Sequence, residues 1–365
     1  MKTMMALAWL CIAGAPLAGT AQAASVGERI ASQADVGEGV QAVGLDSFAN
    51  VSLAFPGGVT GLPNVTYQTL PGYRPMTLDL FLPPESFSKA GPRPWVMYVH
   101  GGGWVMGGPR RSGAYSDWPK VLASLAAEGY VVASVGYRFS REAPFPAAIQ
   151  DVKAAIRWLR VNAVKYNLDP ARGMTWGQSA GGHLAALAAV TCGVPALEPP
   201  PRVVPVARNV ETSPSSPEGA DEVSDCVQGA VAWYGMYDLE TAYAQTTGST
   251  SAPPNIMNLF LACQDAPCPA DRLRAASPTS YVDAKDPPIF LMHGTDDQTV
   301  SVDQTTRFHA ALQAAGVPTK MVVVPGVGHS WIGKTPESTR DTSKGALQQS
   351  IDFIEATIGD ATTKR

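Results

Sequence analysis

The sequence predicts an α/β protein with a mostly parallel central sheet and helices on both faces. Short runs of apolar, β-branched and aromatic residues recur along the chain, each separated from the next by a stretch long enough for a helix. These runs are apolar at consecutive positions, as expected for strands that are buried on both faces of a sheet. The expected strands are residues 95–99, 131–135, 174–176, 229–233, 289–292 and 321–324.

Helical periodicity is clear in two of the intervening segments. Apolar residues at helical spacing predict a helix that starts at residue 148 and runs out near Asn167. Asp151 and Arg157 on this helix are expected to form a structural charged pair. A second helix is expected after residue 301, where Ser301 and Gln304 have the spacing of a capping box, and it should end at residue 316.

Composition limits the class of protein. The chain has 365 residues, a net charge of −4 and only 16% charged residues, so it can bury a large core and has no basic surface typical of nucleic-acid binding. No segment after the first two dozen residues reaches the length of a membrane span. We expect one main domain over residues 75–360, with insertions at 193–225 and 240–278. Residues 24–74 show weak periodicity and are expected to form a lead-in.

The first 23 residues have the features of a secretory signal. Lys2 precedes an apolar stretch, and Ala21-Gln22-Ala23 forms a cleavage site. The mature chain is therefore expected to begin near Ala24 and to be secreted or periplasmic.

Four cysteines follow the predicted signal, and an oxidising compartment favours two disulfides. Three pairings exist. We favour Cys192 with Cys226 and Cys263 with Cys268, because the first bond would tie the base of a segment rich in Pro, Ser and Glu. The alternative is four separate buried thiols. No His or Cys spacing resembles a zinc site, so no metal is expected.

The segment Gly177-Gln178-Ser179-Ala180-Gly181 places a serine between an expected strand and an Ala/Leu-rich helix. Such a turn strains the serine backbone and leaves no room for side chains at the flanking glycines. The hydroxyl would then project above the sheet edge, close to a helix N-terminus that favours a developing oxyanion. Ser179 is therefore a candidate nucleophile.

A serine nucleophile needs a base, and His329 is the candidate because it follows the last expected strand on a glycine-containing loop. The imidazole needs a carboxylate in turn. Asp296 and Asp297 follow the strand at 289–292, and either fits; we favour Asp297, with Asp296 capping the loop. The other histidines have competing explanations: His100 precedes a glycine run, His183 lies on the helix after Ser179, His293 ends a strand and His309 lies within a helix.

A glycine run, His100-Gly101-Gly102-Gly103-Trp104, follows the strand at 95–99. Glycines let backbone N–H groups approach a substrate oxygen closely. We therefore expect Gly102, Gly103 and Ala180 to donate to an oxyanion. Trp104 is a candidate wall for the substrate, although packing in the core would explain it equally well.

Together these motifs resemble the α/β-hydrolase superfamily, and within it the hormone-sensitive-lipase-like carboxylesterases of the bacterial feruloyl-esterase-like branch. The resemblance covers roughly residues 75–358 and includes Tyr137-Arg138, which we expect to support the site from beneath. The chain order Ser179, Asp297, His329 is the order expected for that fold. The departures are the Pro-rich insertion between Cys192 and Cys226 and the segment 241–277, where relatives place cap-like elements.

The resemblance implies a serine esterase that needs no cofactor and acts on feruloyl, acetyl or other small esters, free or linked to polysaccharide. Two alternatives stay open. One is a serine peptidase with the same triad, although its relatives usually carry an extra propeller domain. The other is a non-catalytic binding module, which the presence of every triad residue disfavours.

Overall fold

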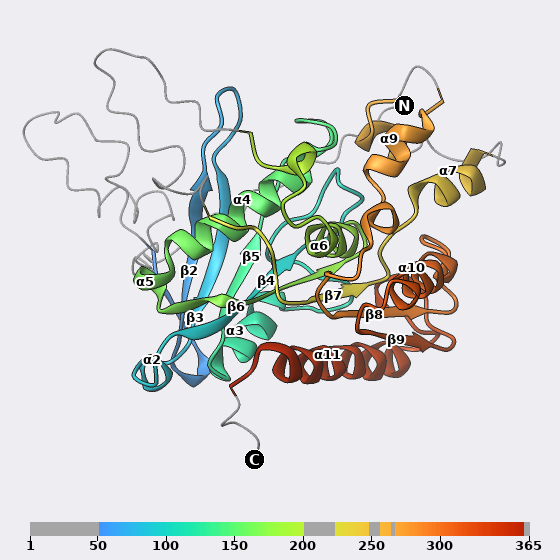
Figure 1. Ribbon diagram of the computed structural model, residues 1–365. Coiled ribbons are helices and arrows are strands. Elements are labelled where there is room, and N and C mark those ends of the chain that lie inside the picture. The colour runs from blue at the N-terminus through green and yellow to red at the C-terminus, as the bar shows by residue number, and fades with distance from the viewer. Residues whose placement is uncertain (1–50, 201–222, 248–255, 264–266, 361–365) are drawn as a thin grey trace, which may run out of the picture. The chain divides into compact units, whose positions relative to one another are not determined.

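The computed structural model describes residues 51–200, 223–247, 256–263 and 267–360. They form a nine-stranded sheet in the order β1-β2-β3-β5-β4-β6-β7-β8-β9 (Figure 1). The predicted signal peptide, residues 1–23, lies outside the described residues, as do 201–222 and 248–255 of the two expected insertions. In the part of the chain that is described, no helix is both long and apolar enough to span a membrane.

All six predicted strands are present, and they form the parallel part of the sheet. Their bounds are β4 Arg93–Val99, β5 Val131–Val135, β6 Leu168–Gln178, β7 Ala230–Trp233, β8 Ile289–Gly294 and β9 Thr319–Val324. Side chains alternate between two cores along these strands. In β4, Trp95, Met97 and Val99 lie in one hydrophobic cluster, while Val96 and Tyr98 lie in the other.

The expected lead-in is wrong for its described part, because residues 51–74 contain two strands of the sheet. These are β1 Leu53–Phe55 and β2 Val59–Gln68, which pair antiparallel with each other and then with β3 Met76–Leu82. The register of β2 against β3 shifts between Leu62 and Val65. This irregularity breaks the alternation from which a strand is recognised in a sequence.

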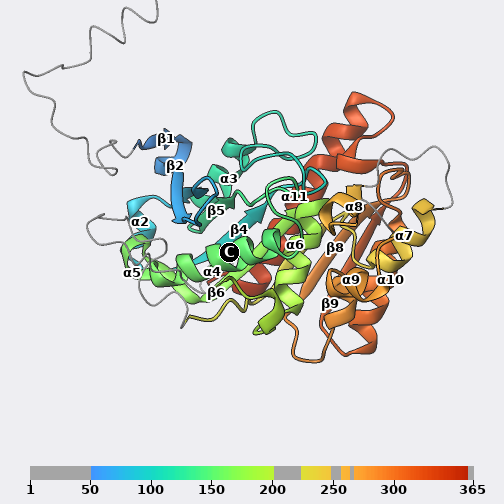
Figure 2. The same cartoon turned by 90° about the horizontal axis from the view of Figure 1, so that it is seen from above.

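Helices cover both faces, as predicted (Figures 1 and 2). One core contains buried residues of α4, α6 and α10, and the opposite core contains those of α3 and α11. The helices are α2 Glu85–Ser88, α3 Trp118–Ala127, α4 Ala147–Val161, α5 Ala163–Tyr166, α6 Ala180–Val190, α7 Leu239–Thr247, α8 Ile256–Phe260, α9 Ala270–Ala275, α10 Val302–Ala314 and α11 Pro336–Ile358. Short 3-10 turns lie at Pro56–Gly58, Pro195–Leu197, Pro278–Tyr281 and His329–Trp331.

Two helix details differ from the prediction. The helix expected from 148 to 167 is divided, because Asn162 ends α4 and its side-chain amide donates to the carbonyl of Trp158 at 2.8 Å. The capping box at the start of α10 does not form. Ser301 caps the amide of Asp303, but the side chain of Gln304 accepts hydrogen bonds from the backbone after β7 instead.

The expected pair between Asp151 and Arg157 is also wrong, because each residue has another partner. Buried Asp151 binds Arg138, with Oδ1 at 2.8 Å from the guanidinium. Arg157 binds Glu198 at the start of the 193–225 insertion. Lys153 lies one turn earlier on α4 and contacts Asp225 at 2.7 Å, so α4 holds both ends of this insertion.

Both favoured disulfides are confirmed. Cys192 bonds Cys226, and Cys263 bonds Cys268. The first bond joins the two ends of the insertion held by α4. The second follows α8 directly, in the segment that contributes to the pocket described below.

The topology brings three loops to one edge of the sheet. From β4 the chain forms β5 on one side, then returns to form β6 on the other side of β4. Loops after parallel strands that diverge in this way leave a crevice at the carboxyl ends. The glycine run follows β4, Ser179 follows β6, and the two aspartates follow β8.

Candidate active site

Ser179 lies on a strained turn between β6 and α6. Its backbone has φ 53° and ψ −124°, a region that non-glycine residues rarely adopt. A Cβ atom at Gly177 would lie 2.1 Å from the carbonyl oxygen of Gly181, and one at Gly181 would lie 2.0 Å from that of Val99. The two glycines are therefore required by close backbone approach, as the sequence predicted.

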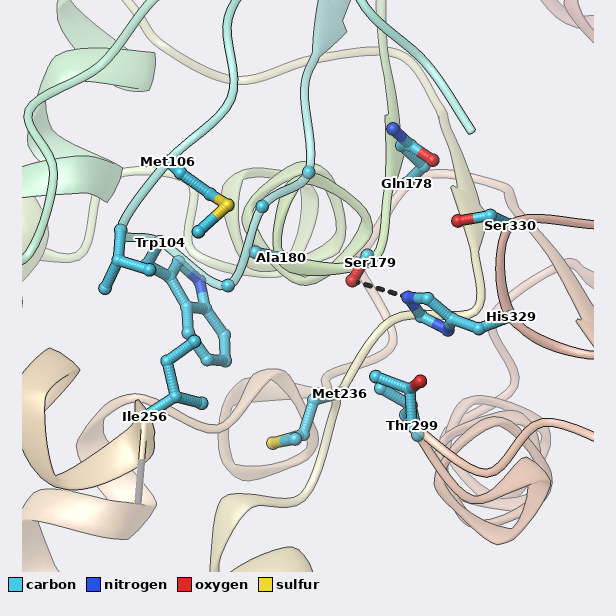
Figure 3. Close-up of a pocket in the computed structure, with 15 residues that line it drawn as sticks. Trp104, Met106, Gln178, Ser179, Ala180, Met236, Ile256, Thr299, His329 and Ser330 are labelled. Carbon is cyan, nitrogen blue, oxygen red and sulfur yellow. Dashed lines mark hydrogen bonds between the residues drawn. The ribbon is translucent and has the colours of Figure 1, made fainter. Parts of the chain in front are cut away.

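His329 is the residue whose ring meets the serine. Its Nε2 lies 2.9 Å from Oγ of Ser179 (Figure 3). The ring also packs edge-on against Tyr234, with centroids 4.7 Å apart. Two residues later, Trp331 is fully buried and anchors the loop.

Asp297 lies on the other side of the imidazole, with Oδ2 2.7 Å from Nδ1 of His329. The carboxylate of Asp296 is exposed and accepts from the Thr295 hydroxyl at 2.8 Å, so it belongs to the loop itself. The structure thus brings Ser179, His329 and Asp297 into one hydrogen-bonded series and leaves Asp296 outside it.

The Asp297 carboxylate is stabilised in its charged form. Burial alone would raise its pKa, but hydrogen bonds from His293 and His329 and from the amide of Val300 hold the pKa well below its usual range. Oδ1 accepts from the amides of Thr299 and Val300 at 2.8 and 2.9 Å. A charged carboxylate fixed in this way orients the His329 ring and stabilises its protonated form.

The loop that carries Asp297 and the loop that carries His329 are bonded to each other. The amide of Asp296 donates to the carbonyl of Val327 at 3.0 Å, and the amide of Gly326 donates to the hydroxyl of Thr295 at 2.8 Å. Asp297 and His329 are therefore held in one geometry by the backbones of their own loops.

The glycine run after β4 turns sharply beside Ser179. Gly102 and Gly103 have φ values of 118° and 60°, and the carbonyl of Gly102 accepts from the amides of Val105 and Met106, both at 3.1 Å. Within the described residues, the amides of Gly102, Gly103 and Ala180 have no hydrogen-bond acceptor. All three residues line the same pocket as Ser179, so their N–H groups are available to an oxygen bound there.

The pocket has a volume of about 370 Å³ and mostly apolar walls (Figure 3). It is lined by Gly101, Gly102, Gly103, Trp104, Val105, Met106, Gln178, Ser179, Ala180, Met236, Ile256, Thr299, Val300, His329 and Ser330. The lining contains no Asp, Glu, Lys or Arg. The cavity therefore suits an uncharged group placed next to Ser179.

Trp104 fits both of the roles considered for it. The indole is buried, stacks on Phe260 and lines the pocket. Its Nε1 donates to Nδ1 of His183 at 3.1 Å, and Nε2 of His183 faces the carbonyl of Ala276 at 2.7 Å. His183 is thus a buried structural link, as expected, and burial lowers its pKa to about 4.

Two further expectations about supporting residues agree with the structure. The hydroxyl of Tyr137 donates to the carbonyl of His100 at 3.0 Å, directly before the glycine run. Arg138 forms the buried pair with Asp151 described above. Tyr137 thus supports the start of the glycine run, and the neighbouring Arg138 is fixed by Asp151.

Several residues around the site were not identified from the sequence. Ile256 and Phe260 come from α8, a helix of five residues in the 240–278 segment, which is too short to show periodicity. From the sequence, His293 is recognisable only as the end of a strand. Its spacing of four residues from Asp297 is the one sequence feature that could have linked it to the acid.

A serine on a strand–turn–helix elbow and a histidine after the last strand, on a parallel sheet of this order, define an α/β-hydrolase. The chain belongs to the BD-FAE family, whose family model matches residues 78–312. The matched range contains Ser179 and Asp297 and ends before His329.

Among curated proteins, the chain is similar to the esterases LipQ and LipC of Mycobacterium tuberculosis. Each is 32% identical, over 72% and 66% of this chain. The chain spans only about half of their length, 55% and 53%. It is also 29% identical to the carboxylesterase NlhH of the same organism, over 71% of this chain and 74% of that protein.

Among solved structures, a truncated carbohydrate esterase from gut microbiota has a TM-score of 0.64 and 27% identity. The match covers 84% of this chain and 99% of that one. Esterase Est2 of Thermogutta terrifontis has a TM-score of 0.61 at 22% identity, over 85% of this chain and 96% of that one, and shows the shared fold.

Proposed function

We propose that the protein is a serine carboxylic ester hydrolase that acts through an acyl-enzyme. The observation that carries this proposal is the hydrogen-bonded series from Ser179 through His329 to Asp297, with contacts of 2.9 and 2.7 Å. Ser179 is the nucleophile, His329 the general base and then the general acid, and Asp297 the residue that orients and stabilises the imidazole.

In the first step, Oγ of Ser179 loses its proton to Nε2 of His329 and attacks the ester carbonyl. The negative charge on the tetrahedral oxygen is stabilised by the N–H groups of Gly102, Gly103 and Ala180. The C–O bond to the alcohol then breaks, and the alcohol leaves with the proton from His329. Water repeats the sequence on the acyl-enzyme, releasing the acid and restoring Ser179.

The substrate class that fits is an ester with an uncharged acyl group, such as a feruloyl, acetyl or other small acyl group. Support comes from the apolar walls of the pocket next to Ser179 and from the esterase relatives. The similar gut carbohydrate esterase extends the proposal to acyl groups carried on a polysaccharide.

We further propose that the protein works outside the cytoplasm. The two disulfides support this location, because disulfides persist in oxidising compartments. The predicted signal peptide at residues 1–23 points the same way. Detection of a mature chain that begins near Ala24 in the culture medium or periplasm would test it.

The activity is tested with purified protein on short-chain nitrophenyl esters, methyl ferulate and an aminoacyl anilide. We expect hydrolysis of the esters and none of the anilide. Ser179→Ala should reduce kcat on the order of a millionfold and Asp297→Asn roughly ten-thousandfold. Ser124→Ala on α3 and Asp296→Asn are matched controls that should keep the parent rate. Ester hydrolysis that survives Ser179→Ala would overturn the proposal.

A further inference from the structure

His293 is a completely buried histidine in direct contact with the acid of the triad. It lies at the end of β8, and its Nε2 is 3.2 Å from Oδ2 of Asp297, the same oxygen that contacts His329. Nε2 also lies 2.9 Å from the carbonyl oxygen of Val300. On the other side of the ring, Nδ1 is 2.6 Å from the hydroxyl of Thr305.

These contacts determine where the His293 proton lies. Nε2 faces a carboxylate oxygen and a carbonyl oxygen, and both can only accept, so Nε2 carries the hydrogen. Nδ1 is then the acceptor, and the Thr305 hydroxyl donates to it. Thr305 is buried on α10 near Tyr237, whose hydroxyl accepts from the amide of Gly235 at 3.1 Å.

Within the described residues, four donor nitrogens lie within 3.2 Å of the Asp297 carboxylate oxygens. Oδ1 accepts from the amides of Thr299 and Val300, and Oδ2 accepts from His329 and His293. Without His293, Oδ2 would keep only the donor from His329. The carboxylate would then lack the buried group that holds Oδ2 beside the His329 ring.

Building on the proposed function, we propose that His293 and Thr305 form a positioning pair for the triad. Nε2–H of His293 holds Oδ2 of Asp297 in line with Nδ1 of His329, and the Thr305 hydroxyl fixes the His293 tautomer that can do so. Neither residue lines the pocket, so the pair acts on the reaction only through Asp297. A buried histidine that served packing alone would not need its one donor nitrogen to lie between the acid, at 3.2 Å, and the carbonyl oxygen of Val300, at 2.9 Å.

The pair has an electronic effect as well as a steric one. A donor on Oδ2 draws electron density from the carboxylate and weakens it as an acceptor for His329. Loss of the donor should therefore favour protonated His329 and move the acid limb of kcat/KM to higher pH. The other titratable groups that face this network are Tyr234, edge-on to both His293 and His329, and Tyr237, next to Thr305. Both tyrosines have raised pKa values and stay neutral in this range.

The test compares Thr305→Val, which removes the hydroxyl at nearly constant volume, with Thr305→Ser, which keeps it. Thr306→Val is the matched control, since Thr306 is the next residue on α10 and is exposed. We expect Thr305→Val to lower kcat about tenfold, the effect of losing one hydrogen bond in a charged network, with KM within about twofold. Its acid limb should move up by about 0.3 pH units or more. Thr305→Ser and Thr306→Val should match the parent in rate and in pH profile.

A second pair of variants addresses the ring itself. His293→Gln places an amide N–H near the position of Nε2 and should retain more activity than His293→Leu, which has no donor. All rates are normalised to the folded fraction from near-UV circular dichroism. If Thr305→Val does not fold, this second pair decides the question by the same kinetic criteria.

The proposal is overturned if folded Thr305→Val matches the parent in kcat and pH profile, or if Thr305→Ser is impaired equally. Equal activity of the two His293 variants would overturn it too. These outcomes are separate from failure of the proposed function, in which the parent protein would not hydrolyse esters or Ser179→Ala would still do so.

Discussion

The indole of Trp104 stacks on the ring of Phe260, with centroids 4.3 Å apart and planes 12° from parallel. Trp104 follows the glycine run, whereas Phe260 ends α8 in the 240–278 segment. The carbonyl of Phe260 also accepts from the amide of Phe145 at 2.7 Å, in the turn before α4. One wall of the pocket is therefore backed by a segment that lies outside the parallel sheet.

Removing this backing should change selectivity as well as stability. We expect Phe260→Ala to lower the free energy of unfolding by about 3–5 kcal/mol, because the ring is buried and leaves a cavity behind Trp104. The wall can then move, so kcat/KM for bulky acyl esters should rise relative to acetyl esters by about tenfold. Urea unfolding and an acyl-chain series measure the two effects.

Phe353→Ala provides the control for this prediction. Phe353 contacts Phe290 in the opposite core, with centroids 5.3 Å apart, far in the fold from the pocket lining. It should lower stability and leave the acyl preference unchanged. The same change of preference in both variants would contradict the role given to Phe260.

Alanine variants at two neighbouring glycines of the run should respond differently to a second substitution, Ile256→Ala. A Cβ at Gly103 would lie 2.2 Å from Cδ1 of Ile256, and one at Gly102 would lie 2.1 Å from the carbonyl oxygen of Met106. Either alanine should displace an N–H group that we propose stabilises the oxyanion, and should lower kcat about a hundred- to a thousandfold. Adding Ile256→Ala should raise kcat of Gly103→Ala about tenfold, because the clash at Gly103 is with the end of the Ile256 side chain. It should not raise kcat of Gly102→Ala, because the clash there is with backbone. Rescue of both, or of neither, would contradict this geometry.

The parallel half of the fold could be predicted from the sequence because β4 to β8 are buried on both faces at their centres. They appear as largely apolar runs, such as Trp95 to Val99. The antiparallel edge could not. In β2 the pattern of buried and exposed residues is irregular, and its register shifts against β3, so neither periodicity nor apolar content marks it as a strand.

Site residues that lie in a recognisable motif could be predicted from the sequence. Residues that are placed by tertiary contacts could not. Ser179 and His329 stand out by their glycine-rich turns. Both adjacent aspartates fit the sequence pattern, with Asp297 favoured, and the 2.7 Å contact between Asp297 and His329 decides between them. Gln304 has capping-box spacing, yet its side chain reaches the amides of Tyr237 and Asp238. Contacts between distant segments outweigh local preference in that case.

The two disulfides should differ in what they contribute. The bond between Cys192 and Cys226 spans 34 residues and should stabilise the fold by roughly 4 kcal/mol on the chain-entropy model, against roughly 2 kcal/mol for the span of 5 residues between Cys263 and Cys268. Loss of the second bond should raise KM more than loss of the first, because it follows α8, which contributes Ile256 to the pocket and packs Phe260 behind Trp104. Paired Cys→Ser variants, compared by urea unfolding and KM, measure both. A larger increase in KM for Cys192→Ser/Cys226→Ser would contradict this assignment.

Acid should destabilise the fold through two buried histidines. Burial lowers the pKa of His100 and His183 to about 4, against 6.5 in the unfolded chain. The unfolded state therefore binds more protons between these values, so the stability is fully present above pH 6.5 and is lost as the pH falls toward 4. Each histidine accounts for up to about 3 kcal/mol of that loss. Asp286 acts in the opposite direction, because burial raises its pKa to about 6. Comparison with His183→Gln isolates the histidine contribution, and between pH 7 and 4.5 this variant should lose about 2–3 kcal/mol less unfolding free energy than the parent in urea titrations. An equal loss in parent and variant would show that His183 is not one of the groups responsible.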